Sequence, residues 1–148
     1  MFVSIGLCSD QQPTPQANAD FMSNTESEHQ NTLLYNLQTA FATETNEATA
    51  YIAFAKRADD EGYGQVASLF RALAYAEGIH AANKAALIEE LGGSVTYQWD
   101  SLDVGNTIGN LDWALEAETY EQDTMYPRHA SQADKANNRR RSDTMNSA

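Results

Sequence analysis

The sequence predicts an all-α fold, a helical bundle built from two duplicated hairpins with the fourth helix incomplete. The 148-residue chain contains only three prolines and has long Ala- and Glu-rich runs, a composition that favours helices over strands. In three segments the apolar residues recur at steps of three and four, which places them on one helical face. A twelve-residue stretch also recurs later in the chain. With 42% hydrophobic residues, the chain can form one ordinary domain.

Residues 1–30 are expected to form a flexible leader, because residues 9 to about 30 are polar and rich in Gln, Asn and Ser. The first eight residues, MFVSIGLC, are too few to span a membrane and lack the basic start of a secretory signal. The alternative is the remnant of a lipoprotein signal that ends in a lipid-modified Cys8. That remnant would anchor the protein to a periplasmic membrane; without it a cytoplasmic location is the default. The sequence leaves the location open.

Residues 31–148 are expected to form the folded domain, which begins with two helices. The core-facing stripe of the first helix comprises Leu33, Leu37, Phe41, Glu44, Ala48, Tyr51 and Ala55. The stripe of the second comprises Val66, Phe70, Leu73, Glu77 and His80, with Lys84 at its fraying end. Gly62 is expected to cap the first helix, and Gly92-Gly93 to end the second.

A third helix is expected after a connector at residues 94–106. Its core-facing residues are Leu111, Leu115, Glu118, Gln122 and Met125. Pro127 should kink or end this helix, because proline lacks the backbone N–H and clashes with the preceding turn. Residues Asn137 to Ala148 are then expected to begin a fourth helix that is cut short.

The recurring stretch supports a duplicated hairpin. Asn36–Glu47 recurs as Asn110–Glu121, 74 positions later, with six of twelve residues identical and no gap. Shared helix composition alone would not also align the Glu-Thr-x-Glu motif. The repeat predicts a second Glu-x-x-His at positions 151 to 154, beyond Ala148.

Three carboxylates stand on the apolar stripes of three different helices: Glu44, Glu77 and Glu118. An unpaired buried carboxylate costs on the order of several kcal/mol, so cations are expected between these side chains. Glu77 and His80 form a Glu-x-x-His motif, whose two side chains face the same way. Two Glu from two helices plus Glu-x-x-His from two others is the ligand set of ferritin-like di-iron bundles. Three of these four contributions are present.

Two further glutamates and four tyrosines are candidates for the same metal site. Glu121, one turn after Glu118, is a further ligand or a solvated charge, whereas Glu47 is expected in a supporting or surface position. Four tyrosines are expected mainly in the core, where a buried hydroxyl could donate to a metal ligand: Tyr51, Tyr75, Tyr120 and Tyr126.

Composition excludes several other classes of protein. The net charge of −12 would repel a phosphate backbone, so no nucleic-acid partner is expected. The single cysteine excludes an internal disulfide and a Cys-based iron–sulfur or zinc site. No hydrolase-type set of nucleophile, acid and base is suggested, so no catalytic residues are expected beyond the metal ligands.

The sequence resembles the rubrerythrins in three stretches: residues 36–55 (NLQTAFATETNEATAYIAFA), 61–81 (EGYGQVASLFRALAYAEGIHA) and 110–127 (NLDWALEAETYEQDTMYP). The resemblance implies a ferritin-like four-helix bundle with a non-haem di-iron site. It also implies reduction of hydrogen peroxide to water, an oxidoreductase activity that protects against oxidative stress. The residues that fall on the family's ligand positions are Glu44, Glu77, His80, Glu118 and Glu121.

Two departures from the family pattern matter. The paired CxxC motifs of a rubredoxin domain are absent, so the electrons are expected from an external donor such as a rubredoxin-like protein. The second Glu-x-x-His is also absent, which indicates a chain truncated before the fourth helix or a site completed between the chains of a homodimer. Two alternatives stay open: a non-catalytic iron-binding or ferroxidase protein, and a metal-free, truncated helical interaction module.

Overall fold

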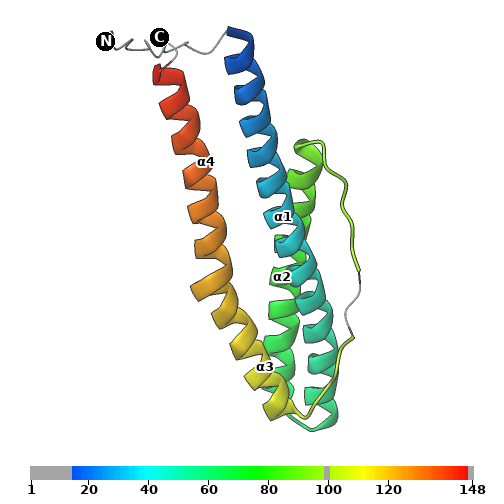
Figure 1. The fold of residues 1–148 in the computed structure, drawn as a ribbon. Helices are drawn as coiled ribbons and strands as arrows, with labels where there is room; N and C mark the ends of the chain where they lie inside the picture. Colours follow the sequence, from blue (N-terminus) through cyan, green and yellow to red (C-terminus); the bar gives the residue numbers. More distant parts are fainter. Residues whose placement is uncertain (1–14, 99–100, 147–148) are drawn as a thin grey trace, which may run out of the picture.

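The computed structural model describes the backbone of residues 15–98 and 101–146, and the side chains of residues 27–98 and 101–136. All regular structure in these ranges is helical, as predicted (Figure 1). The helices form three long rods: α1 (Pro15–Asp60), α2 (Gly64–Glu90), and a third rod from Thr107 to Asn146. None of the described helices combines the length and apolar character needed to cross a bilayer.

The first two helices form an antiparallel hairpin whose turn is the one that the sequence predicts. Gly62 has a φ of 85°, a left-handed conformation that glycine adopts without steric cost. The Gly62 N–H donates to the Asp59 carbonyl at 3.0 Å, and the Tyr63 N–H donates to the Ala58 carbonyl at 2.7 Å. At the other end of the hairpin, Gly92 has a φ of 77° and follows α2, as expected.

The third rod contains α3 (Thr107–Tyr120), the π-helical segment η1 (Glu121–Met125) and α4 (Tyr126–Asn146). Asn106 caps α3 by accepting a hydrogen bond from the Gly109 N–H at 2.8 Å. Glu61 lies in the turn between α1 and α2 and accepts two hydrogen bonds from Thr107. The Thr107 N–H donates at 2.9 Å and the Thr107 hydroxyl at 2.7 Å. These contacts fasten the start of the third rod to the hairpin.

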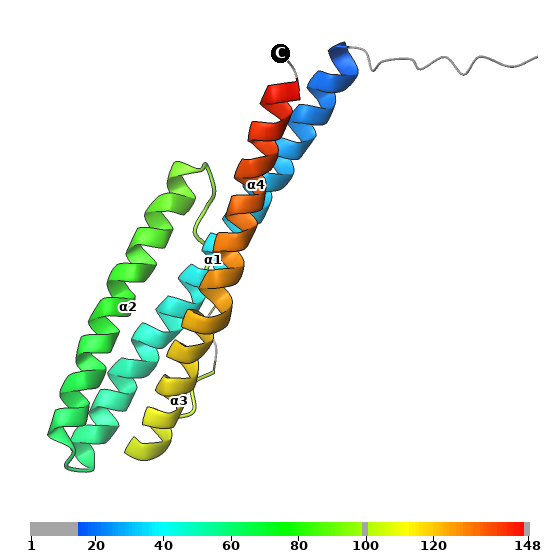
Figure 2. The same ribbon diagram turned by 90° about the vertical axis from the view of Figure 1, so that its left-hand side faces the viewer.

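The rod continues past Pro127, where we expected a kink or an end (Figures 1 and 2). Pro127 is the second residue of α4 and directly follows the π-helical segment. In a π-helix the hydrogen bonds run to the fifth residue instead of the fourth, so the pattern changes just before the proline. A proline in the first turn of the new α-helix needs no N–H donor there, which explains why the chain stays helical.

Two boundaries differ from the expected ones. Residues 137–146 were expected to begin a fourth helix, but they extend α4 in the same direction; residues 147–148 lie outside the described ones. Residues 15–30 were expected in the leader, but they form the first part of α1, because a helix propagates at little cost from a stable neighbouring turn. Residues 1–14, including Cys8, lie outside the described residues.

In space, α1 lies between α2 and the third rod and contacts both (Figure 2). An aromatic cluster fills the bundle near the α1–α2 turn. The ring centroids of Phe54 and Phe70 are 5.5 Å apart, those of Phe54 and Trp113 are 5.4 Å apart, and both pairs meet edge to face. Tyr51 stacks on Phe70 at 5.9 Å. Alanines let the helices approach closely around the cluster: Ala50, Ala55, Ala58, Ala67 and Ala114.

The predicted stripe of the third rod is confirmed at Leu111 and Met125 but is wrong at two positions. Leu115 is 68% exposed and Gln122 is also exposed, whereas Ala114 and Glu121 are buried. Tyr75 and Tyr120, expected mainly in the core, are 74% and 49% exposed. Burial follows the repeat more closely than hydrophobicity does. The pairs of buried residues separated by 74 positions are Asn36 and Asn110, Ala40 and Ala114, Glu47 and Glu121, and Tyr51 and Met125.

We predict that Phe70→Ala lowers the free energy of unfolding by about 3–5 kcal/mol, because it leaves a cavity beside the rings of Tyr51 and Phe54. Leu69→Ala is the matched control on the same helix. Leu69 is 50% exposed, so its truncation should change stability by no more than about 0.5 kcal/mol. Urea titration followed by circular dichroism measures both. Equal losses in the two variants would contradict the assignment of the core to the Phe70 face.

Candidate metal centre

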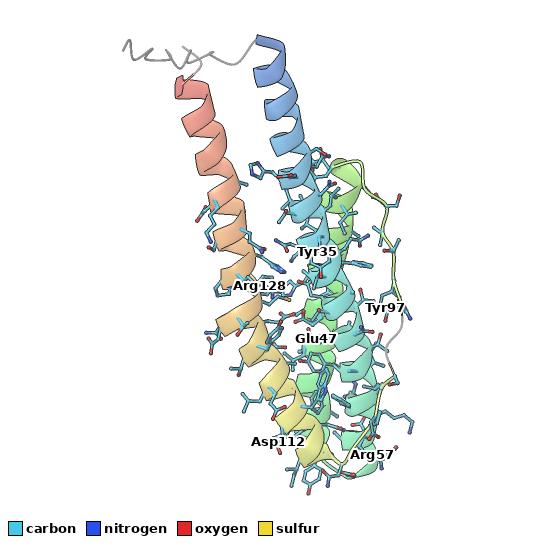
Figure 3. The ribbon with its side chains drawn as sticks, viewed as in Figure 1. Tyr35, Glu47, Arg57, Tyr97, Asp112 and Arg128 are labelled. Atoms are coloured by element: carbon cyan, nitrogen blue, oxygen red, sulfur yellow. The ribbon has the colours of Figure 1, made fainter. Side chains whose placement is uncertain are left out.

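Five glutamates converge at mid-height in the bundle, on the side of the aromatic cluster away from the α1–α2 turn. Figure 3 shows the surroundings of Glu47, midway along the hairpin and facing the third rod. The helical pattern accounts for this convergence, because each glutamate follows its helix's core-facing residues at three- or four-residue steps. The five are Glu44 and Glu47 from α1, Glu77 from α2, Glu118 from α3 and Glu121 from η1.

The inner group consists of Glu47, Glu77 and Glu121, one residue from each rod. Each offers a carboxylate oxygen, and these three oxygens lie within 4.8 Å of one another. The three residues are 4%, 3% and 6% exposed. Oxygens bound to one cation at about 2.0–2.6 Å are at most about 5 Å apart, so this spacing suits ligands of a single ion.

Glu44 lies next to this group and is fully buried, at 0% exposure. Its Oε1 atom accepts a hydrogen bond from the Tyr126 hydroxyl and lies 3.0 Å from the Lys84 ammonium. Lys84, which we expected at a fraying helix end, is thus directed into the bundle.

Glu118 is held in a similar way from the other side. The Tyr51 hydroxyl of α1 donates to Glu118 Oε1 at 2.8 Å, while Tyr126 of α4 donates to Glu44 of α1. Burial raises the pKa of both tyrosines, and the neighbouring carboxylates raise it further. Both hydroxyls therefore remain protonated donors, and each one ties a carboxylate of one rod to another rod.

His80 stands at the edge of the site. Its Nδ1 atom is 3.1 Å from Glu77 Oε2, and its side chain is 50% exposed. The structure thus pairs the two residues of the Glu-x-x-His motif. It leaves His80 outside the inner group of three carboxylates.

The carboxylates strongly perturb one another. Burial, together with the charges of Glu121 and Glu77, raises the pKa of Glu47 to about 9. Burial likewise raises the pKa of Glu121 to about 7 and raises the pKa of Glu77. The negative charges of these neighbours add to the effect of burial, so the carboxyls of Glu47 and Glu121 hold their protons more tightly than a free glutamate does.

The donor set fits divalent metal ions. Three buried carboxylate oxygens have no hydrogen-bond partner among the described side chains: Glu44 Oε2, Glu47 Oε2 and Glu121 Oε1. Buried polar atoms are nearly always paired, so three orphans in one cluster point to ligands that are not hydrogen-bond donors. Carboxylates with one imidazole are a donor set that suits iron and manganese.

Glu47 lies deeper in the site than its sequence pattern predicts. We expected a supporting or surface position, but the residue is 4% exposed and belongs to the inner group. The repeat contained the missing signal, since it aligns Glu47 with Glu121, which we considered a candidate ligand. Glu44, Glu77, His80, Glu118 and Glu121 all lie in or beside the cluster, and their metal ligation stays a prediction.

Fold and site together define an all-α protein of the ferritin-like class with a carboxylate centre between its helices. The family model described as rubrerythrin matches residues 35–148. This chain therefore belongs to the rubrerythrin family.

Three curated relatives have similar sequences. Nigerythrin from Nitratidesulfovibrio vulgaris is 36% identical over 108 residues, which cover 71% of this chain and 52% of the relative. A putative rubrerythrin from Methanocaldococcus jannaschii is 34% identical over 111 residues, covering 69% and 54%. Rubrerythrin-2 from Clostridium acetobutylicum is 32% identical over 92 residues, covering 62% and 50%. The chain thus spans about half the length of these relatives. No solved structure gives a significant match.

We predict that the metal-free protein loses stability as the pH rises from about 5 to about 9. The pKa of Glu47 is about 9 in the folded protein against 4.5 ordinarily, so the folded state binds more protons than the unfolded chain between these values. Stability therefore falls with rising pH across this window. Melting temperatures measured in the presence of a chelator test this, with about 2–4 °C expected for each kcal/mol lost.

Glu47→Gln should flatten this pH dependence, because glutamine carries no titrating proton. Glu28→Gln, which changes an exposed residue of the same helix, controls for the general effect of the protein's negative charge. If the two variants and the unmodified protein gave parallel curves, the buried carboxyl would not be the cause.

Proposed function

We propose that this protein binds a pair of non-haem iron ions between its three rods and reduces hydrogen peroxide with electrons from another protein. One observation carries the proposal: three buried carboxylates, one from each rod, bring their oxygens within 4.8 Å of one another. The orphaned oxygens of the same cluster support it, because cations would supply the missing partners.

The ligand assignment combines family resemblance with geometry. Glu44, Glu77, His80, Glu118 and Glu121 fall on the family's ligand positions, and the geometry adds Glu47. The inner group would hold the metal at its centre, with Glu44 and Glu118 flanking it. Tyr51 and Tyr126 would each hold one oxygen of a flanking carboxylate and leave the other free to bind.

Iron held by these residues would supply the two electrons that the reduction needs, one from each ferrous ion. With two protons, one molecule of hydrogen peroxide would then give two molecules of water. The protein's own residues define where this occurs. The aromatic cluster packs on the side of the site toward the α1–α2 turn, while His80 stands at the edge of the site with a half-exposed side chain. A small substrate such as peroxide would enter beside His80.

The electrons would come from a donor outside these 148 residues, since the only cysteine in the sequence is Cys8. A rubredoxin-like protein is the proposed donor. We also propose that the chain acts as a homodimer in which the partner can add ligands to the site.

We predict that anaerobic Fe(II) titration gives stoichiometric binding, with about one iron per chain if two chains share a site and about two if each chain holds a complete site. Peroxide added with an external reductant should then be consumed catalytically. Glu77→Ala should weaken iron binding at least about tenfold and abolish turnover, because it removes a carboxylate from the inner group. Glu89→Ala, at an exposed position of the same helix, is the matched control and should behave like the unmodified protein.

The other outcomes separate the competing interpretations. Iron binding that depends on Glu77 but gives no turnover would favour a non-catalytic iron-binding or ferroxidase protein. About one iron per chain in a dimer would support a site completed between chains. Absence of binding, with Glu77→Ala more stable than the unmodified protein, would overturn the proposal and favour a metal-free interaction module.

A further inference from the structure

Lys84 is a cation directed into a site that we expect to bind cations. Its side chain is 22% exposed, and its Nζ atom lies 3.0 Å from Oε1 of the fully buried Glu44. The residue follows Glu77 and His80 at steps of three and four, so all three side chains share one face of α2. The ammonium group thus belongs to the same surface as the Glu-x-x-His motif.

Among the described side chains, Lys84 is more buried than the other lysine and arginine residues that form ion pairs. Lys56, Arg57 and Arg71 have side chains that are 78%, 45% and 54% exposed, and their partners lie at the α1–α2 turn. The Lys84 ammonium also lies 5.5 Å from the centre of the Tyr126 ring, whose hydroxyl donates to the same oxygen of Glu44. A single glutamate oxygen therefore has two partners, while its Oε2 atom has none.

We propose that Lys84 is an internal counter-ion that neutralises Glu44 in the metal-free protein and must move away when a metal ion binds there. This inference rests on the proposed function, because it concerns the regulation of the same site. An ammonium group and a divalent cation that approach one carboxylate repel each other strongly in a water-poor interior. Lys84 therefore opposes metal binding and lowers the affinity of the site.

The lysine side chain suits this role. It carries a compact charge on a flexible four-carbon stem, and its partial exposure gives the ammonium a short path to solvent. Movement of one side chain would release Glu44 Oε1 without moving a helix. The Tyr126 hydroxyl would still hold that carboxylate in place.

The alternative is an ion pair that serves stability alone. Buried ion pairs contribute little to stability compared with apolar side chains of similar size, so stability is a weak reason to place a lysine here. The two interpretations predict different metal affinities. If Lys84 competes with metal, its neutralisation tightens binding; if it only supports the fold, its neutralisation leaves affinity unchanged or weakens it.

The test measures the dissociation constant of Co(II), a spectroscopic probe for divalent ions, by competition with a chelator. Lys84→Met and Lys84→Gln should each bind Co(II) at least about tenfold more tightly than the unmodified protein, because the competing charge is gone. Lys84→Arg keeps the charge and should stay within about threefold. Lys56→Met removes an exposed, paired lysine and should change affinity by less than about twofold.

The same samples provide a second measurement. Without metal, Lys84→Met should melt at a lower temperature, because Glu44 is left buried without its counter-ion. The rise in melting temperature on adding Co(II) should be larger than in the unmodified protein. Circular dichroism confirms that each variant is helical; if neither Lys84→Met nor Lys84→Gln folded, the pair would be structural and the inference wrong.

The remaining outcomes distinguish this inference from the proposed function. Co(II) binding that depends on Glu77 in the unmodified protein, but is unchanged or weaker in Lys84→Met and Lys84→Gln, would overturn the role of Lys84 and leave the metal site standing. Absence of Co(II) binding in the unmodified protein and in both variants would overturn both proposals.

Discussion

The repulsion between buried carboxylates is the constraint on which the rest of the site depends. Glu44, Glu47, Glu77 and Glu121 are each no more than 6% exposed and lie at one level of the bundle. Such a cluster is unfavourable unless its charge is reduced. Tyrosine hydroxyls donate to Glu44 and Glu118, the Lys84 ammonium pairs with Glu44, and the raised pKa of Glu47 favours its neutral form. Each of these lessens the repulsion, and a bound cation could replace the last two.

The neighbouring hydrophobic core offsets the unfavourable free energy of these buried carboxylates. Phe54 packs edge to face against both Phe70 and Trp113 near the α1–α2 turn, and burial of each of the two phenylalanines contributes about 1.5–3 kcal/mol. Tyr51 belongs to both regions, since its ring stacks on Phe70 and its hydroxyl donates to Glu118. The aromatic cluster that stabilises the fold therefore lies near the α1–α2 turn, the charged site lies beside it, and Tyr51 contacts both.

Much of the fold was predictable because it follows from local chemistry. The caps at Gly62 and Gly92 and the register of the repeat are confirmed. On the third rod, Leu111 and Met125 were predicted correctly, but the larger Leu115 is exposed while the small Ala114 is buried in the core. Hydrophobicity alone does not identify the face along which helices approach each other. Lys84 was misplaced for a related reason, because its partner comes from another helix and no pattern within α2 indicates it.

The π-helical segment explains how the two halves of the sequence repeat present equivalent tyrosines. Tyr51 follows Glu44 by seven residues, whereas Tyr126 follows Glu118 by eight, yet each tyrosine donates to the glutamate of the other copy. One extra residue in an α-helix would rotate everything after it by about 100°. Segment η1, Glu121–Met125, absorbs that residue in a wider turn. The insertion thus places Tyr126 at the position equivalent to Tyr51 and restores the pair of hydrogen bonds that joins the rods.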